Sequence, residues 1–297
     1  MKPTIFIHTN DKQMLPAKVC AYSLEARSKH SEAFEIRLLR LEETPYLYPG
    51  REGRRYLWDR RVCIWHNRDL QSFGPLRMKV PELMNFSGRA LVLDPDIFAV
   101  GDVYELLQRD MKGKAILSRR RPSGFFTSSV MLLDCAQLKH WHWNQNIDAI
   151  FAFKLDLYHW LALKSENPDT IGVLEDEWNH LDVLNESTKL FHLTERLTQP
   201  WKTGLPVDFD LDQVGSYLYR PGFHASDLVK RVKQSFSSWR MLPMGHYLPH
   251  PDLQQENYFV AMLKEAIEHG AISEQFVAEE IQRQYVRKDI FDLLAKV

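Results

Sequence analysis

The stretch Leu91–Phe98 constrains the fold of this chain more than any other, because an apolar run ends there in two carboxylates. Leu91, Val92 and Leu93 have the composition of a buried strand, and Asp94 and Asp96 follow with one proline between them. Open α/β sheets bind ligands at the carboxyl ends of their strands. Two oxygen ligands there suit Mg²⁺ or Mn²⁺ holding a phosphate group. The alternative is structural, since Asp-Pro pairs also form ordinary turns.

Short strands alternate with helices over most of the chain. The patterns predict strands at 4–7, 35–41, 90–93, 114–117, 128–133 and 190–193, and helices at 14–28, 76–84, 103–107 and 136–163. Residues 42–75 show no period, so we expect irregular structure that borders a site. This alternation predicts an α/β fold, with a mostly parallel sheet flanked by helices.

The chain changes character after about residue 220. Helical patterns alone follow, at 226–235, 252–268 and 273–294. A length of 297 residues allows one large domain with a smaller appendage. We therefore predict a domain at 1–220 and a helical C-terminal extension at 221–297.

Charge and cysteine content narrow the class of protein. With 38 Lys and Arg against 39 Asp and Glu, the formal net charge is -1, so we expect no nucleic-acid partner. Cys20, Cys63 and Cys135 are odd in number and sit in apolar or helical settings, which favours reduced thiols in the cytoplasm. The apolar run at the N-terminus is too short for a signal peptide. No other run approaches the roughly 20 residues of a membrane span, so we expect membrane contact to be peripheral at most.

An ordered set of motifs points to one family. The set comprises Pro75–Met84, Gly88–Asp96, Gly101–Leu106, Phe126–Asp134, Trp178-Asn179, His192–Thr194 and Gln199–Gly204. It resembles the core of the family 8 glycosyltransferases, which have the GT-A fold and transfer sugars from nucleotide-sugars with retention of anomeric configuration. The resemblance spans residues 4 to 210 and implies that residues 1–220 form the nucleotide-sugar-binding catalytic domain.

The resemblance implies a metal site. Asp94, Asp96 and His192 would coordinate one divalent cation, Mn²⁺ or Mg²⁺, that bridges the diphosphate of a UDP-sugar. An imidazole and two carboxylates with open positions suit Mn²⁺ better than Ca²⁺. Taken alone, His192 would more often be a core or turn histidine.

Further positions resemble those that hold the donor. Thr9, Asn10 and Asp11, at the end of the first strand, match the family positions for the uridine base and ribose. For Asn10 or Asp11 alone, helix capping is an equal alternative. Arg77 resembles the arginine directed at the donor, and its alternative role is a surface ion pair.

The chain also departs from the family pattern. Glu195 and Gln199 stand where relatives commonly carry a glycine and a lysine, so the diphosphate clamp is altered. Lys202, three residues farther on, could supply the missing charge. Thr127 replaces the usual asparagine and keeps a hydrogen-bonding group.

The aspartate-glutamine-aspartate motif, which lies near the departing sugar in relatives, has no clean counterpart. Asp156 stands at about the right distance before Trp178-Asn179. The run Glu175-Asp176-Glu177 is the second candidate, so Asp176 stays beside Asp156 as a possible catalytic carboxylate.

The sequence therefore predicts a metal-dependent hexosyltransferase. It would transfer a hexose from a UDP-sugar to a glycan, lipid-linked or small-molecule acceptor. The rival is a non-catalytic GT-A module that binds a nucleotide-sugar or glycan, which the altered clamp favours. A nucleotidyltransferase is disfavoured because the first strand lacks a glycine-rich phosphate loop. The sugar, the acceptor and the oligomeric state depend on loop shape and are left open.

Overall fold

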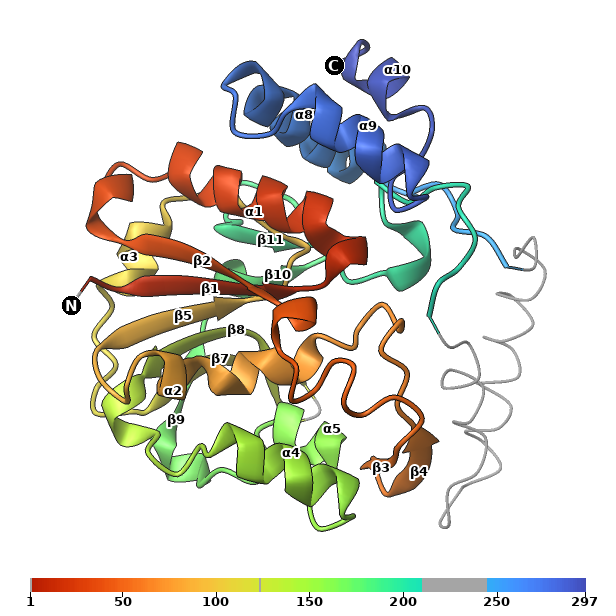
Figure 1. The fold of residues 1–297 in the computed structure, drawn as a ribbon. Coiled ribbons are helices and arrows are strands. Elements are labelled where there is room, and N and C mark those ends of the chain that lie inside the picture. The colour runs from red at the N-terminus through yellow and green to blue at the C-terminus, as the bar shows by residue number, and fades with distance from the viewer. Residues whose placement is uncertain (1, 123, 210–244) are drawn as a thin grey trace, which may run out of the picture.

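A computed structural model describes residues 2–122, 124–209 and 245–297 (Figure 1). Its central six-stranded sheet has the order β2-β1-β5-β8-β7-β9. The strands are β1 (Thr4–Thr9), β2 (Glu35–Arg40), β5 (Arg89–Leu93), β7 (Ile116–Arg120), β8 (Phe126–Asp134) and β9 (Ile171–Leu174). β8 runs antiparallel to both of its neighbours, and every other adjacent pair is parallel. The predicted mostly parallel sheet flanked by helices is confirmed.

The two faces of the sheet build two apolar cores, because side chains alternate along each strand. In β1, Ile5 and Ile7 face one core, and Phe6 faces the other. The first core is covered by α1 (Met14–Ala26) and, beyond it, by α8 (Leu253–Glu268) (Figure 1). The second is covered by α2 (Val80–Leu83), α4 (Trp143–Phe151) and α5 (Leu157–Leu161).

Two smaller sheets complete the described chain. β6 (Ile97–Ala99), β10 (His180–Leu181) and β11 (Leu190–His192) form one of them, and β3 (Arg55–Trp58) pairs with β4 (Arg61–Ile64) in the other. The prediction that 42–75 is irregular was therefore wrong in part. The exposed positions of this hairpin carry Arg55 in β3 but Val62 and Ile64 in β4, so its sequence shows no polar-apolar alternation. Asp59 and Arg60 form its turn with positive φ angles.

Several predicted elements differ in detail. The helical stretch at 136–163 consists of α4 and α5, separated by a turn in which Phe153 has a φ of 60°. The helix predicted at 76–84 begins as a 3₁₀ helix, Gly74–Lys79, which continues into α2, whereas the one at 103–107 is α3 (Val103–Leu107). β9 was not predicted, because it is short and contains Gly172.

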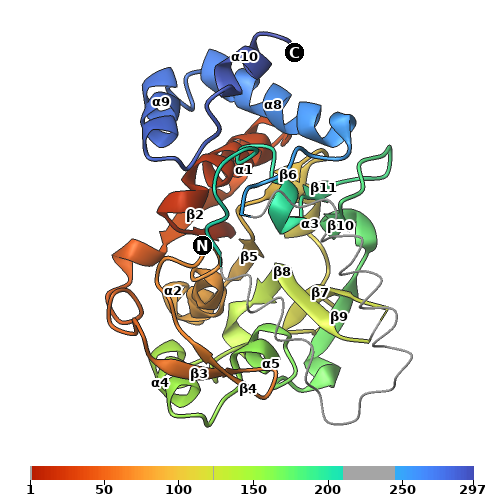
Figure 2. The same cartoon turned by 90° about the vertical axis from the view of Figure 1, so that its right-hand side faces the viewer.

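The C-terminal helices pack on α1 at one end of the molecule (Figure 2). The stretch predicted at 273–294 is divided into α9 (Glu274–Gln282) and α10 (Ile290–Leu294). Trp201 packs against Phe98 of β6 and Phe259 of α8, with its ring centroid 4.9 Å from that of Phe259. The helix predicted at 226–235 and the boundary at 220/221 lie outside the described residues.

Candidate active site

Strand pairing brings the three predicted metal ligands together. Asp94 and Asp96 lie in the turn between β5 and β6, where the Asp94 N–H donates to the Ser129 carbonyl at 3.0 Å. β11 pairs antiparallel with β6, which places His192 opposite Ile97 and therefore beside Asp96. Ligand atoms of Asp94, Asp96 and His192 all lie within 4.8 Å of one another. This spacing fits a single divalent cation.

A buried hydrogen-bond network orients the His192 ring. The Asn179 amide nitrogen donates to Thr127 Oγ1 at 3.2 Å and to Ser129 Oγ at 2.9 Å, so its oxygen faces His192 Nδ1 at 2.9 Å. Nδ1 must then carry a proton, and in the neutral ring the lone pair of Nε2 points toward Asp96 Oδ1, 3.3 Å away. In that state two acceptors face each other, which favours a metal cation between them. Asp96 Oδ1 is buried and makes no hydrogen bond with the described residues.

Two further side chains hold Asp94. His8 Nε2 lies 2.8 Å and Arg77 Nη2 lies 2.9 Å from Asp94 Oδ1. Burial lowers the pKa of His8, so a neutral His8 donates its Nε2 proton. Burial alone would raise the pKa of Asp94, but Arg77 and His8 outweigh it and hold that pKa below its usual range. Asp94 is therefore an oriented carboxylate.

Burial and the neighbouring carboxylates shift the pKa of His192 in opposite directions. Burial lowers the pKa of His192, whereas the carboxylates of Asp96 and Asp94 raise it, and the result is a raised pKa. The same negative potential attracts a metal cation. The donor set of two carboxylates and one imidazole with a held tautomer fits Mn²⁺ or Mg²⁺.

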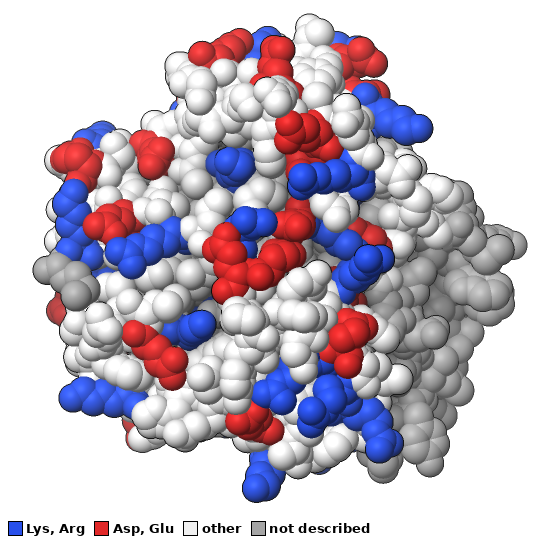
Figure 3. All heavy atoms as spheres, in the orientation of Figure 1, with Lys and Arg blue, Asp and Glu red and all other residues white. Residues whose placement is uncertain are grey.

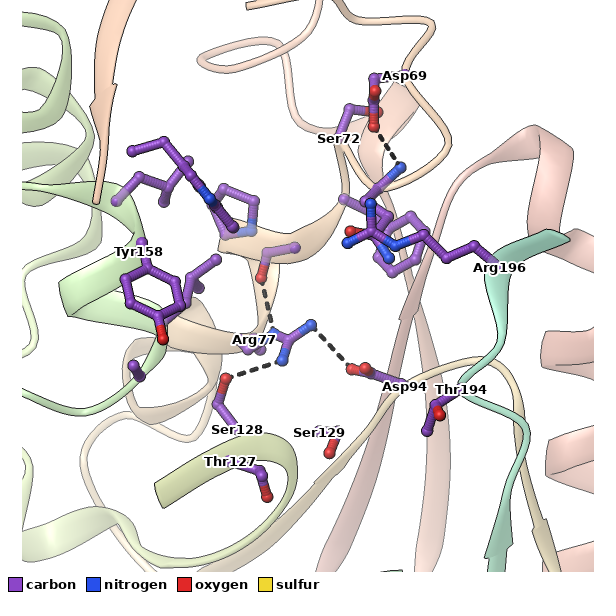
Figure 4. A pocket seen from close by; sticks show the side chains of 18 of the residues that line it. Asp69, Ser72, Arg77, Asp94, Thr127, Ser128, Ser129, Tyr158, Thr194 and Arg196 are labelled. Carbon is purple, nitrogen blue, oxygen red and sulfur yellow. Dashed lines mark hydrogen bonds and ion pairs between the residues drawn. The ribbon is translucent and has the colours of Figure 1, made fainter. Parts of the chain in front are cut away.

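The three residues open onto a cavity of about 380 Å³. Its polar wall carries Arg77, Ser128, Ser129, Thr194 and Arg196, as Figure 4 shows. Its other end is largely apolar and aromatic, and is lined by Tyr56, Trp58, Ile64, Phe125, Phe126 and Tyr158. A ligand with a charged group and an apolar face could therefore contact a polar wall and an aromatic wall in the same cavity.

Of the predicted site residues, the structure brings five to this cavity: Arg77, Asp94, Asp96, Thr127 and His192. The others, which are Thr9, Asn10, Asp11, Asp156, Asp176 and Lys202, do not line it. Arg77 is held by three acceptors, because it donates to the Gly74 carbonyl at 3.0 Å and to Ser128 Oγ at 2.8 Å in addition to Asp94.

The residues after β1 support the cavity from outside. The Asn10 amide donates to the Leu70 carbonyl at 3.2 Å and thereby holds the segment that contributes Asp69 and Ser72 to the cavity wall. Thr9 Oγ1 donates to the Asn10 carbonyl, and Asp11 pairs with Arg40 at 2.7 Å. Neither Asn10 nor Asp11 caps a helix through its side chain in this structure.

The two candidate catalytic carboxylates lie apart from the metal ligands. Asp156 caps α5 and accepts backbone N–H groups of His159 at 3.1 Å, Asp59 at 3.0 Å and Arg60 at 2.6 Å. Burial alone would raise its pKa, but these bonds lower it. Asp176 is exposed and pairs with Arg119 at 2.9 Å.

Lys202 is fully buried and is paired elsewhere. Its Nζ lies 3.0 Å from Asp208 Oδ2, while Tyr247 donates to Asp208 Oδ1 at 2.6 Å. Burial lowers the pKa of Lys202, although Asp208 opposes that effect. The structure therefore gives Lys202 a partner other than a ligand in the cavity.

Reasoning from the sequence missed His8, Ser129 and Arg196. His8 is the neighbour of Ile7, which pairs with Leu93 in the sheet, so its contact with Asp94 follows from strand order. Ser129 lies within the motif Phe126–Asp134 and Arg196 lies two residues after His192–Thr194, but only the folded chain turns them toward the cavity.

Comparison with known proteins yields structural neighbours alone. The sequence matches no protein-family model and, at a significant level, no curated protein. The glycosyltransferase GlyE of Streptococcus pneumoniae TIGR4 superposes with a TM-score of 0.48 and 13% identity over 91% of this chain and 64% of GlyE. The galactosyltransferase LgtC, in complex with donor and acceptor sugar analogs, superposes with a TM-score of 0.47 and 12% identity over 74% of this chain and 98% of LgtC. Mouse xyloside xylosyltransferase 1 superposes with a TM-score of 0.44 and 15% identity over 65% of this chain and 98% of the xylosyltransferase.

The chain thus spans less than two thirds of the length of GlyE. Likenesses of this size leave the function to be argued from the residues of the site.

One face of the molecule carries both signs of charge (Figure 3). Acidic and basic side chains are interspersed over the face shown in Figure 3. Among the described residues, no helix combines the length and the apolar character that crossing a membrane requires.

Proposed function

We propose that this protein is a metal-dependent glycosyltransferase that transfers a hexose from a UDP-sugar to a glycan, lipid-linked or small-molecule acceptor with retention. The proposal rests on one observation, the convergence of Asp94, Asp96 and His192 at the wall of a cavity. The motif order described above, which resembles the family 8 glycosyltransferases, supports the GT-A assignment and the choice of donor.

The chain's own residues would do most of the positioning. Asp94, Asp96 and His192 would hold Mn²⁺ or Mg²⁺, and such an ion would neutralise negative charge on a leaving nucleoside diphosphate. His8 and Asn179 keep two of these ligands in their orientation before substrate arrives. This preorganisation lowers the cost of stabilising developing charge.

Arg77 and the nearby hydroxyl groups would contact the donor. The Arg77 guanidinium has donors beyond those it uses on Gly74 and Asp94, and Ser128 and Ser129 present hydroxyls beside it. Attack by an acceptor hydroxyl on the same face as the leaving group needs charge stabilisation and alignment, with no protein nucleophile. That route agrees with the placement of Asp156 and Asp176 outside the cavity.

A second candidate function is a non-catalytic module that binds a nucleotide-sugar or a glycan. The observation in its favour is that Lys202 is committed to Asp208 and cannot also reach a diphosphate without breaking that pair. The absence of both carboxylate candidates from the cavity wall points the same way.

Calorimetry on the purified protein tests both candidates. We expect UDP-glucose or UDP-galactose to bind only when Mn²⁺ is present, with slow release of UDP from the bound donor. Binding without any UDP release, in the presence of a range of acceptors, would favour the non-catalytic module. The donor site itself would be rejected if no binding occurred at any metal concentration.

Substitution of Asp94 tests the metal assignment. Asp94→Ala and the isosteric Asp94→Asn should both lose Mn²⁺-dependent UDP binding, whereas Asp292→Ala, at an exposed position of α10, should retain it. An unchanged Mn²⁺-dependent affinity in both Asp94 variants, with circular dichroism like that of the wild type, would refute the assignment.

A further inference from the structure

Arg196 projects into the cavity from the segment that follows β11. It lies four residues after His192, at the start of a 3₁₀ helix, Arg196–Thr198. The Leu193 N–H donates to the Asp96 carbonyl at 3.1 Å, and the Thr194 N–H donates to Asp182 Oδ1 at 2.7 Å. Figure 4 shows the Arg196 side chain extending into the cavity on the side of Asp69 and Ser72. Its direction is thus set by the same backbone that positions a metal ligand.

Arg196 differs from Arg77 and Lys202 in its contacts. Arg77 is held by Asp94, Ser128 and Gly74, and Lys202 is held by Asp208. Within the described parts of the chain, the guanidinium of Arg196 makes no ion pair or hydrogen bond, and its one recorded contact is with the Phe209 ring, at 5.9 Å from the centroid. Among the described residues nothing occupies its five N–H donors, so they can serve a ligand.

The charge balance of the cavity shows what kind of ligand would fit. Among the charged lining residues, Asp69 and Arg121 offset each other. Asp94 and Asp96, offset by Arg77, leave one net negative charge, and a His192 that binds a metal is neutral. A divalent cation turns this into one net positive charge, and Arg196 raises it to two. A doubly charged anion with several acceptor oxygens matches both the charge and the planar donor pattern of a guanidinium.

We propose that Arg196 binds the diphosphate of the ligand and supplies the positive charge that Lys202 does not. This inference rests on the proposed function, since it assigns a phosphate-binding role within the same site. A diphosphate could enter as part of a nucleoside diphosphate or as free pyrophosphate, and the two sources share the oxygens that Arg196 would contact.

Binding of three probes tests the proposal. UDP, inorganic pyrophosphate and uridine are titrated into the wild type, Arg196→Gln and Arg196→Lys, each with Mn²⁺. We expect Arg196→Gln to weaken UDP binding about 10- to 100-fold, because it removes charge-assisted hydrogen bonds, and to leave uridine binding unchanged. Arg196→Lys should recover part of the UDP affinity, since it restores a point charge.

The pyrophosphate titration separates the two sources. A loss of pyrophosphate affinity in Arg196→Gln that equals the loss for UDP means that Arg196 contacts phosphate alone, whichever molecule carries it. A loss for UDP with no binding of pyrophosphate by any variant restricts the site to nucleoside diphosphates.

A control and two contrary outcomes complete the test. Arg109→Gln removes an arginine that pairs with Glu175 away from the cavity, and it should leave all three affinities unchanged. Equal UDP affinity in the wild type and Arg196→Gln would overturn the role of Arg196 while leaving the proposed function standing. If the wild type bound neither UDP nor pyrophosphate with Mn²⁺, both proposals would fall together.

Discussion

Replacing Asn179 by alanine should weaken divalent-cation binding without touching a ligand. The Asn179 oxygen accepts the Nδ1 proton of His192 at 2.9 Å, which keeps Nε2 unprotonated and directed at Asp96. Without this acceptor, the neutral ring can carry its proton on Nε2 and can turn. Loss of such a supporting hydrogen bond typically lowers metal affinity by about 10- to 100-fold. At room temperature this corresponds to about 1.4–2.7 kcal/mol.

The same substitution should lower the free energy of unfolding. Asn179 is fully buried, and its amide nitrogen also serves Thr127 at 3.2 Å and Ser129 at 2.9 Å. Three buried hydrogen bonds are lost, each with a net contribution of about 1 kcal/mol. We therefore expect a loss of about 3 kcal/mol in the absence of metal.

Two measurements separate these effects. Electron paramagnetic resonance of free Mn²⁺ gives the metal affinity at a temperature where the variant is folded, and urea denaturation in chelator gives the stability. Asn185→Ala, which changes an exposed asparagine that caps a turn, should change the metal affinity by less than about 2-fold. If Asn179→Ala lost stability but kept the Mn²⁺ affinity of the wild type, His192 would not be a ligand oriented through Asn179.

Three predictions concern the C-terminal helices. Burial raises the pKa of Glu280 to about 7. The protonated Glu280 side chain therefore stabilises the fold fully below pH 4.5, and this stabilisation is lost as pH rises through 7. At pH 8.5, Glu280→Gln should have a free energy of unfolding up to about 3 kcal/mol above that of the wild type in urea denaturation. Arg287→Met should lower the free energy of unfolding by about 3–5 kcal/mol, because it leaves the Glu256 carboxylate, 2.7 Å from Arg287, without its ion-pair partner. The double variant Glu256→Met, Arg287→Met should recover most of that loss. Trp201→Ala should lower the free energy of unfolding by about 3–5 kcal/mol. A melting temperature equal to that of the wild type would contradict the packing of Trp201 against Phe259.

Local sequence patterns predicted most of the central sheet and its helices. The apolar run before Asp94 and the run at 128–133 form β5 and β8, since a buried strand reads as a short apolar segment whatever lies beside it. The hairpin β3–β4 was missed because apolar Val62 and Ile64 occupy exposed positions, so its strands lack a polar-apolar alternation. Short elements with mixed composition depend on what packs against them.

The residues of the candidate site also fall into those that the local sequence identified and those that depend on the fold. Asp94 and Asp96 could be singled out because both stand next to one strand, and their position requires no knowledge of distant segments. Arg77 and His192 needed the motif order as well. Lys202 was expected at a phosphate from its distance along the chain, yet the fold buries it against Asp208. Sequence spacing limits how far a side chain can reach and does not determine which partner it meets.

The sequence alone determined the alternation of strands and helices and the carboxylate pair at the end of β5, because both depend on residues close together in the chain. Only the tertiary structure decided which groups surround that pair. His8 reaches Asp94 through the pairing of β1 with β5, and Asn179 reaches His192 across β10 and β11. Arg196 reaches the same cavity from the segment after β11, and among the described residues it makes no ion pair there. Such contacts join segments far apart in sequence, and hydrogen bonding and burial select them only when the chain is folded.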